Sequence, residues 1–296
     1  MAYSTINKQT SHFNTLAYSG TGSSNAITGV GFQPDWTWIK QRNGTADHRI
    51  VDAVRGVTKD IYSNLTTAQG TNTNGLTAFG SDGFTVGSDG GYNGSSDTYA
   101  SWNWKANGQG SSNTAGSINT TYTSVNTTAG FSISTYTGNG TSGATVGHGL
   151  GAVPQIIWVK ALTGSNNWAC YHVSIGATKY FRLNTNDAAA TSTARWNDTA
   201  PTSSVFSIGN DCYGTTSVIQ IDENYKNAII HSLVSVLGHH HENLNEACVM
   251  INTGHSYPIG DMLLDLGLNV VNLQRTQQDY QAFERKRHIS CESFSL

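Results

Sequence analysis

The chain repeats itself at a spacing of about 120 residues. Pro34 precedes "WTWIK", and 120 positions later Pro154 precedes "IIWVK" in the same way. Two further matches, "GVTK" with "GATK" and "FTVG" with "FSIG", follow in the same order; they begin at residues 56, 176, 84 and 206. Matches in a fixed order at a nearly constant spacing predict a tandem duplication, in which each copy folds as one unit.

Each copy has the pattern of short β-strands. Segments rich in aromatic and β-branched side chains are bounded by Gly, Asn and Asp, which is typical of strands joined by tight turns. These segments are 35–41, 48–54, 83–88 and 98–106 in the first copy, and 155–161, 168–173, 179–184 and 204–209 in the second. Because no helical periodicity interrupts them, we predict a mainly β fold with two tandem antiparallel β-sandwich or jelly-roll-like domains.

Two of these segments also predict how their strands are placed. "IIWVK" is apolar on both faces, which predicts a central strand that is covered on both sides. In "SWNWK" the alternation of side chains puts Trp102 and Trp104 on one face of the strand and Ser101 and Asn103 on the other.

The composition changes abruptly near residue 218. Residues 1–218 contain 28 of the 32 Gly and no Glu, whereas the rest of the chain holds all five Glu and six of the ten His. Apolar residues then recur at helical spacing over 222–238 and 259–287, which predicts an α-helical segment. The predicted domains are a first β-sandwich repeat at 1–106, a polar linker at 107–130, a second repeat at 131–218 and a helix-rich C-terminal module at 219–296.

The second copy does not end as the first copy does. The first closes with "DTYASWNWKANG", and the second has "TTSVIQIDENYKN" at the matching place. We therefore expect the closing strand of the second copy to be altered or supplied from elsewhere. A subunit that lacks a strand is a candidate for pairing with a neighbouring subunit.

Charge and cysteine usage exclude several classes of function. Only 12% of the residues are charged and the net charge is −3, so we expect neither nucleic-acid binding nor a polybasic membrane patch. No apolar run reaches the roughly 20 residues that a membrane-spanning helix needs, and the first residues lack the apolar segment of a secretory signal peptide. The four Cys are widely spaced without a C-x-x-C motif, which predicts free and mostly buried thiols.

Three aromatic residues are candidates for ligand binding. An aromatic ring packs well on the C–H face of a sugar, and such a ring has to be exposed to do so. Tyr92, Trp168 and Trp196 lie closer to loops than the other large aromatic residues, so they are the candidates. The remaining Trp residues lie within predicted strands, where packing in the core is expected.

Three Asp residues are candidates for calcium binding. Asp82, Asp89 and Asp97 lie in or beside a Gly-rich loop, and calcium prefers several oxygen ligands from such loops. The spacing of an EF-hand is absent. A plain turn is the alternative interpretation of this segment.

A His-rich cluster further along the chain is a candidate for zinc binding. In "LGHHHENLNEAC" the side chains of His239, His241 and Cys248 are of metal-binding types, but their spacing matches no zinc motif. We therefore expect no cofactor, with calcium or zinc as the alternatives.

No stretch carries a recognised catalytic motif. Residues 1–218 hold ten Asp and no Glu, with no pair of carboxylates that stands out for glycoside hydrolysis, and no G-x-S-x-G turn is present. We therefore predict a protein without enzymatic activity. The alternatives are a carbohydrate-binding module, a capsule-depolymerising enzyme or a metal-dependent hydrolase.

Taken together, the motifs of both copies resemble a known family. The segments are "MAYSTINKQTSHFNT", "GVGFQPDWTWIK", "DAVRG" and "SWNWKANG" in the first copy, and "YTGNG", "VGHGLG", "YHVSIGATKY" and "WNDTAPTSSVFSIG" in the second. In this order they resemble a repeated β-rich domain of structural proteins of tailed bacteriophages, particularly those of marine and aquatic environments. The resemblance covers about residues 1–218.

This resemblance implies a virion component of the tail or tail fibre, without established enzymatic activity. It implies a protein that is assembled in the host cytoplasm and released by lysis. The expected partners are further copies of the chain, for which a trimer is the usual arrangement in fibres, other virion proteins, and a glycan or protein on the host surface.

Overall fold

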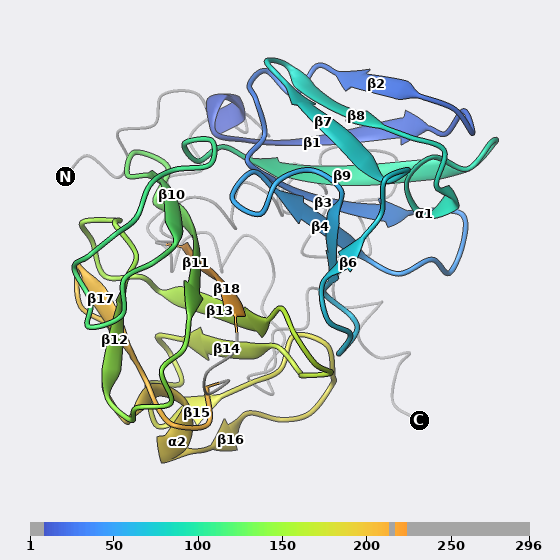
Figure 1. The fold of residues 1–296 in the computed structure, drawn as a ribbon. Coiled ribbons are helices and arrows are strands. Elements are labelled where there is room, and N and C mark those ends of the chain that lie inside the picture. The colour runs from blue at the N-terminus through green and yellow to red at the C-terminus, as the bar shows by residue number, and fades with distance from the viewer. Residues whose placement is uncertain (1–8, 213–216, 224–296) are drawn as a thin grey trace, which may run out of the picture. The chain divides into compact units, whose positions relative to one another are not determined.

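The computed structural model describes residues 9–212 and 217–223 (Figure 1). The chain divides into two compact units, residues 1–239 and 240–296, and every described residue lies in the first of them. The helix predicted over 259–287 and most of the one predicted over 222–238 lie outside the described residues. Among the described residues, no helix is long and apolar enough to cross a membrane.

The first repeat consists of two antiparallel sheets that pack face to face. The larger sheet has the strand order β1-β9-β3-β4-β5-β6 and the smaller one β2-β8-β7. The strands are β1 (Phe13–Ser19), β2 (Asn25–Thr28), β3 (Trp36–Gln41), β4 (Arg49–Asp52), β5 (Lys59–Tyr62), β6 (Gly70–Thr71), β7 (Leu76–Gly80), β8 (Gly83–Val86) and β9 (Thr98–Trp104). A short 3-10 turn, η1 (Gln9–Ser11), precedes β1, and a one-turn helix, α1 (Gly90–Asn93), precedes β9.

The second repeat has the same construction. A sheet of order β10-β11-β18-β13-β14 faces a two-stranded sheet, β12-β17, and a short pair, β15-β16, lies beside them. The elements are β10 (Tyr122–Asn126), β11 (Phe131–Thr137), β12 (Ala144–Gly147), β13 (Ile156–Ala161), β14 (Ala169–His172), β15 (Lys179–Tyr180), β16 (Ala190–Thr191), α2 (Thr193–Trp196), β17 (Val205–Ile208) and β18 (Ser217–Glu223).

The strand order confirms the predicted pair of antiparallel β domains. The run β1-β9-β3-β4 of the first large sheet recurs as β11-β18-β13-β14 in the second. β3 and β13 begin at Trp36 and Ile156, so these equivalent strands keep the spacing of 120 residues that the sequence shows. Each repeat encloses its own buried core, which includes Ile39 and Phe84 in the first repeat and Val159 and Phe206 in the second.

The predicted end of the second repeat is wrong. β18 lies between β11 and β13; it pairs with β11 from Ser217 to Glu223 and with β13 from Val218 to Glu223. It is therefore the equivalent of β9, and the chain itself supplies it. The proposed boundary at residue 218 cuts through this strand, and the helix predicted from Asp222 begins inside it. The prediction failed because β9 is marked by aromatic residues, whereas β18 fills the same place with aliphatic ones.

The predicted linker between the repeats is also wrong in part. Residues 122–126 form β10, which pairs with β11 at the edge of the second sheet. Upstream of it, Ile118 is buried and forms a bridge with Val146. The polar composition of this segment concealed the strand because Thr123 and Ser124 are buried and hydrogen-bonded there through their hydroxyl groups.

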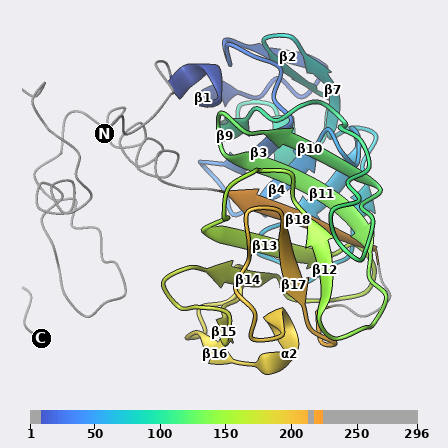
Figure 2. The same ribbon diagram turned by 90° about the vertical axis from the view of Figure 1, so that its left-hand side faces the viewer.

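The two repeats share a third buried core. The large sheets of the two repeats lie against each other (Figure 2). Buried side chains from both sheets pack together between them. The fully buried members are Trp36, Ile50, Val54, Ile61, Ala106, Phe131, Ile133, Trp168, Cys170, Ile219 and Ile221. The described part of the chain is thus a stack of β layers in which sheets and apolar cores alternate.

This stacking confirms the prediction for "IIWVK". β13 lies between β18 and β14, with Ile157 and Val159 in the core of the second repeat and Trp158 against the shared core. In β9 the faces alternate as predicted. Its more buried face is the polar one, because Ser101 and Asn103 point into the first repeat and are fully buried.

Candidate functional site

The three aromatic residues predicted to bind a ligand are buried instead. Tyr92 and Trp168 are 0% exposed and Trp196 is 2% exposed, so none offers a ring face to a sugar. Their polar atoms are also engaged. The indole N–H groups donate to backbone carbonyls, that of Trp168 to Tyr62 at 2.8 Å and that of Trp196 to Lys179 at 3.1 Å. Proximity to loops was misleading because each ring packs into a buried core: Tyr92 in that of the first repeat, Trp168 in the one between the repeats and Trp196 in that of the second repeat.

The three Asp residues predicted to bind calcium do not come together. Among the described residues there is no group of three or more metal-binding side chains. Asp82 accepts hydrogen bonds from two backbone N–H groups, those of residues 29 and 31, and Asp89 caps α1 by accepting from the N–H of Gly91 at 2.8 Å. Asp97 accepts from the Tyr99 hydroxyl. Each carboxylate thus holds its own turn in place.

The predicted zinc ligands His239, His241 and Cys248 lie outside the described residues. Two of the four cysteines are described, and both are free and buried, as predicted. Burial raises the pKa of the Cys212 thiol to about 12, so it stays protonated and unreactive near neutral pH.

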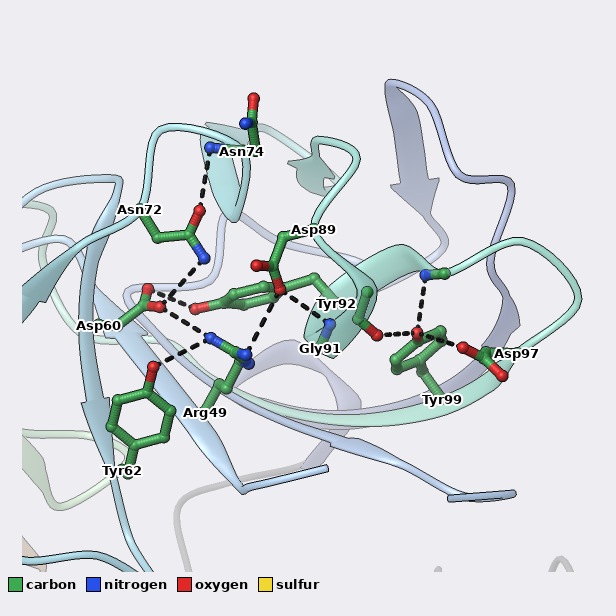
Figure 3. A network of polar contacts seen from close by, with 12 residues as sticks. Arg49, Asp60, Tyr62, Asn72, Asn74, Asp89, Gly91, Tyr92, Asp97 and Tyr99 are labelled. Carbon is green, nitrogen blue, oxygen red and sulfur yellow. Dashed lines mark hydrogen bonds and ion pairs between the residues drawn. The ribbon is translucent and has the colours of Figure 1, made fainter. Parts of the chain in front are cut away.

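A network of charged and aromatic side chains joins α1 to the first sheet (Figure 3). The guanidinium group of Arg49 donates to Asp60 at 3.1 Å and lies 3.5 Å from Asp89. The rings of Tyr62 and Tyr92 flank it, with centroids 5.3 and 5.0 Å away. Because both carboxylates and both rings face one cation, its charge is fully compensated within the protein.

The buried acid of this network is also compensated. Burial raises the pKa of Asp60, and hydrogen bonds from the Tyr92 hydroxyl and the nearby Arg49 guanidinium act in the opposite direction. The Tyr92 hydroxyl donates to Asp60 at 2.6 Å. The hydrogen bonds and ion pairs of this network hold the helix on the sheet, while Nε of Arg49 is buried without a hydrogen-bond partner among the described residues.

A buried lysine ties the two repeats together. Lys160, on β13, is 0% exposed and donates to the backbone carbonyls of Thr66 in the first repeat and Asn166 in the second, at 3.0 and 2.9 Å. Burial lowers its pKa to about 8. The N–H of Asn166 also donates to the carbonyl of Thr66, at 2.8 Å, so the ammonium group strengthens a hydrogen-bonded contact between the two repeats.

A row of half-buried rings lies where the two large sheets meet. We call Trp38, His48, Trp102 and Trp158 the aromatic row. The ring of Trp38 has its centroid 6.1 Å from that of Trp102, 6.2 Å from that of Trp158 and 5.9 Å from that of His48. All four side chains are partly accessible to solvent. Angled rings that are open on one side suit the C–H faces of a sugar.

Within the aromatic row, the indole N–H groups of Trp38 and Trp158 differ in their hydrogen bonding. The Trp38 indole N–H donates to Nδ1 of His48 at 3.2 Å, and burial lowers the pKa of His48, which favours the neutral ring that can accept. Trp158 is the equivalent of Trp38, but its own indole N–H is buried and has no partner among the described residues. The position equivalent to His48 holds Trp168, which offers no acceptor atom.

The family described as "Domain of unknown function (DUF7483)" matches residues 8–241, which is most of the 296-residue chain. The chain belongs to the DUF7483 family. No curated protein and no solved structure matches it significantly.

The extent of the DUF7483 match agrees with the fold. It includes both repeats and β18, and it ends within two residues of the compact unit 1–239. The DUF7483 match thus spans every described strand of both repeats and the core that they share.

The aromatic row of this DUF7483 chain was missed in the sequence because every Trp inside a predicted strand was assigned to the core. One signal does point to it. Trp38 and Trp158 occupy the same place in the two copies, so equivalent outer faces carry the same large ring. An aromatic side chain repeated on an outer face indicates that the two faces meet each other.

The buried acid Asp222 in this DUF7483 domain is expected to lower the stability of the fold at neutral pH. Asp222 on β18 is fully buried, and of its two carboxylate oxygens only Oδ2 has a partner among the described residues, Gln220. Burial raises its pKa well above the usual value. Its equivalent in the first repeat is Asn103 on β9, a neutral residue in the same register between β1 and β3.

We expect Asp222→Asn to stabilise the domain at neutral pH by about 1–2 kcal/mol. An acid with a raised folded-state pKa contributes stability at low pH that is lost as the pH rises through that pKa. The gain from Asn should therefore be small near pH 4 and grow toward pH 8. Urea unfolding of both proteins at several pH values measures it. An equal difference at all pH values would contradict the assignment.

Proposed function

We propose that this DUF7483 chain is a non-enzymatic structural protein of a tailed-bacteriophage virion, associated with the tail or a fibre and involved in binding the host. The observation that carries the proposal is the shared core, which joins two β-sandwiches into one stiff body. An appendage that transmits contact with a host needs stiffness more than it needs a catalytic cleft. The resemblance of the repeats to phage structural proteins points in the same direction.

The chemistry of the domain supports this proposal. The charged groups that are most deeply buried serve to hold turns and sheets in place, as in the pair formed by Asp52 and Arg55 at 2.6 Å. The low charge of the chain makes its packing insensitive to changes in salt, since salt screens ionic contacts and not apolar ones. We infer that it assembles with further copies of itself and with other virion proteins.

Immunogold electron microscopy tests this proposal. Antibodies raised against residues 9–223 should label one structure of virions from lysates in which the chain is produced. Labelling at the tail or fibre is the expected result. A protein that stays entirely in the particle-free fraction of the lysate would overturn the proposal.

A second candidate function is carbohydrate binding at the aromatic row. The observation that favours it is the set of three Trp rings at angles to one another, all of them partly accessible to solvent. Sugars are bound by ring faces together with a few hydrogen-bonding groups. This function and host binding are compatible, because the receptor of a virion can be a surface glycan.

We expect Trp102→Ala to remove glycan binding while the domain stays folded. Trp102 belongs to the aromatic row and not to the buried shared core, so its loss should leave the fold intact and weaken binding at least tenfold. Tryptophan fluorescence titrated with hexasaccharides of glucose, galactose and N-acetylglucosamine measures the effect. Trp102→Tyr keeps an aromatic face and should retain most of the affinity. A wild-type protein that binds none of these sugars, and no spot of a bacterial glycan array, would remove this candidate.

A further inference from the structure

The two large sheets are covered to different extents on the faces that pack in the shared core, here called their contact faces. In the second repeat, four residues of this face are at most 2% exposed: Lys160, Trp168, Ile219 and Ile221. The equivalent residues of the first repeat are all half-buried: Lys40, His48, Ala100 and Trp102. The first large sheet thus keeps part of its contact face accessible beside the shared core.

The accessible part of this contact face combines a large ring with small side chains. On β9, Ala100 and Trp102 lie two residues apart and therefore on the same face. Ala100 has Ala17 of β1 on one side and Lys40 of β3 on the other. Ala17 is exposed, and the other three are half-buried. The two Ala place only methyl groups beside the indole, so a flat molecule such as a sugar can reach it.

The ammonium group of Lys40 has binding capacity that the described protein does not use. It donates to the carbonyls of Gln41 and Gly44 at 2.6 and 3.0 Å, which leaves one of its three N–H donors. Among the described residues, no carboxylate forms an ion pair with Lys40. Asp47, in the same turn, accepts a hydrogen bond from the Asn64 amide at 2.8 Å instead. Lys40 therefore offers a positive charge and a donor to a ligand.

Lys40 lies beside the aromatic row. It is two residues from Trp38 on β3 and so on the same face of the sheet. Burial and then the nearby Lys40 ammonium group lower the pKa of His48, which places this charge close to a ring of the row. Its equivalent Lys160 is 0% exposed and donates to the carbonyls of Thr66 and Asn166. Of these two equivalent lysines, only Lys40 is accessible to a ligand.

Given carbohydrate binding at the aromatic row, on which this inference rests, we propose that the bound saccharide is acidic. Its C–H faces pack on Trp38 and Trp102, and its carboxylate accepts a hydrogen bond from the remaining N–H of Lys40. The net charge of the chain is −3, so the protein as a whole does not attract an acidic sugar. A preference for one has to come from a local cation, which makes Lys40 the residue that determines specificity.

Two forms of one sugar test the charge preference directly. Hexagalacturonate carries a carboxylate on every sugar unit, and its methyl ester has the same backbone without the charge. At neutral pH and low ionic strength, tryptophan fluorescence of the full chain should show about tenfold tighter binding of the acid form, as expected for one charge-assisted hydrogen bond. Added salt should reduce the difference, since salt screens the contact between the ammonium group and the carboxylate.

Substitutions of Lys40 locate this preference in the site. Lys40→Gln should weaken binding of hexagalacturonate about tenfold and leave binding of the methyl ester unchanged. Lys40→Arg keeps the charge and should keep most of the preference. Lys179→Gln is the matched control, because it removes the same charge from an exposed position of the second repeat and should change neither affinity. Urea unfolding of each variant checks that the fold is retained.

The possible failures are distinguishable from one another. Equal affinity of the wild type for both forms would overturn the acidic saccharide and leave carbohydrate binding at the aromatic row in place, as would binding of neutral hexasaccharides alone. A preference that survives in Lys40→Gln, or that is lost equally in Lys179→Gln, would overturn the role of Lys40. Binding to no sugar at all would remove the carbohydrate candidate together with this inference.

Discussion

Ending the chain at residue 216 should abolish folding of the domain, whereas ending it at residue 241 should leave the domain folded. The first truncation removes β18, which pairs with β11 on one side and with β13 on the other. It also removes Val218, Ile219 and Ile221, which are at most 2% exposed. Burial of each such side chain contributes about 1.5–3 kcal/mol, so their loss alone removes much of the 5–15 kcal/mol that stabilises a typical domain.

Soluble yield, circular dichroism and size-exclusion chromatography distinguish the two truncated proteins. The shorter one should be insoluble or should lack a cooperative unfolding transition. The longer one contains the whole DUF7483 match and should unfold in a single transition, because the shared core couples the two repeats. A soluble, cooperatively folded protein that ends at residue 216 would contradict the central role of β18.

Trp168→Ala should destabilise the domain by about 3–5 kcal/mol, as expected for removal of a large buried ring. The ring is 0% exposed and belongs to the shared core, and its N–H donates to the carbonyl of Tyr62 in the other repeat. The variant therefore loses packing and a hydrogen bond between the repeats together. Equilibrium unfolding in urea measures the free energy.

Two matched variants separate these contributions. Trp168→Phe keeps most of the packing and removes only the donor, so we expect a loss of about 1–2 kcal/mol. Val173→Ala changes a side chain that is 50% exposed and should stay within about 0.5 kcal/mol of the wild type. A Trp168→Ala protein with unchanged stability and altered sugar binding would restore the original interpretation of Trp168 as a ligand-binding residue.

The strands that could be predicted from the sequence are those rich in aromatic or β-branched residues. The segments 35–41 and 155–161 became β3 and β13, and both sit at the centre of their sheets. β10 was not predicted because its buried residues are Thr and Ser, whose hydroxyl groups are paired only when the fold brings partners to them. The predicted domain boundary at residue 218 fell inside β18 because the change in composition there was interpreted as a change of domain.

The candidate site was less predictable than the fold for a related reason. Exposure was inferred from proximity to loops, but Trp196 packs against Tyr171 and Phe206 in the core of the second repeat. Conversely, Trp102 lies within a strand and is still partly accessible, because the shared core covers Trp104 of the same strand and does not extend to Trp102. Periodicity shows which side chains share a face, and only packing shows whether a second layer covers that face.

The contact between Trp38 and Trp158 has a consequence for how the molecule behaves on dilution. These residues hold equivalent positions in the two copies and touch each other, as matching residues do in an isologous dimer. The two repeats thus pack against each other like the subunits of a dimer, but within one polypeptide. Association of the halves is intramolecular and independent of concentration, so the two repeats stay together on dilution. The parts of the two large sheets that form the shared core are covered by this pairing.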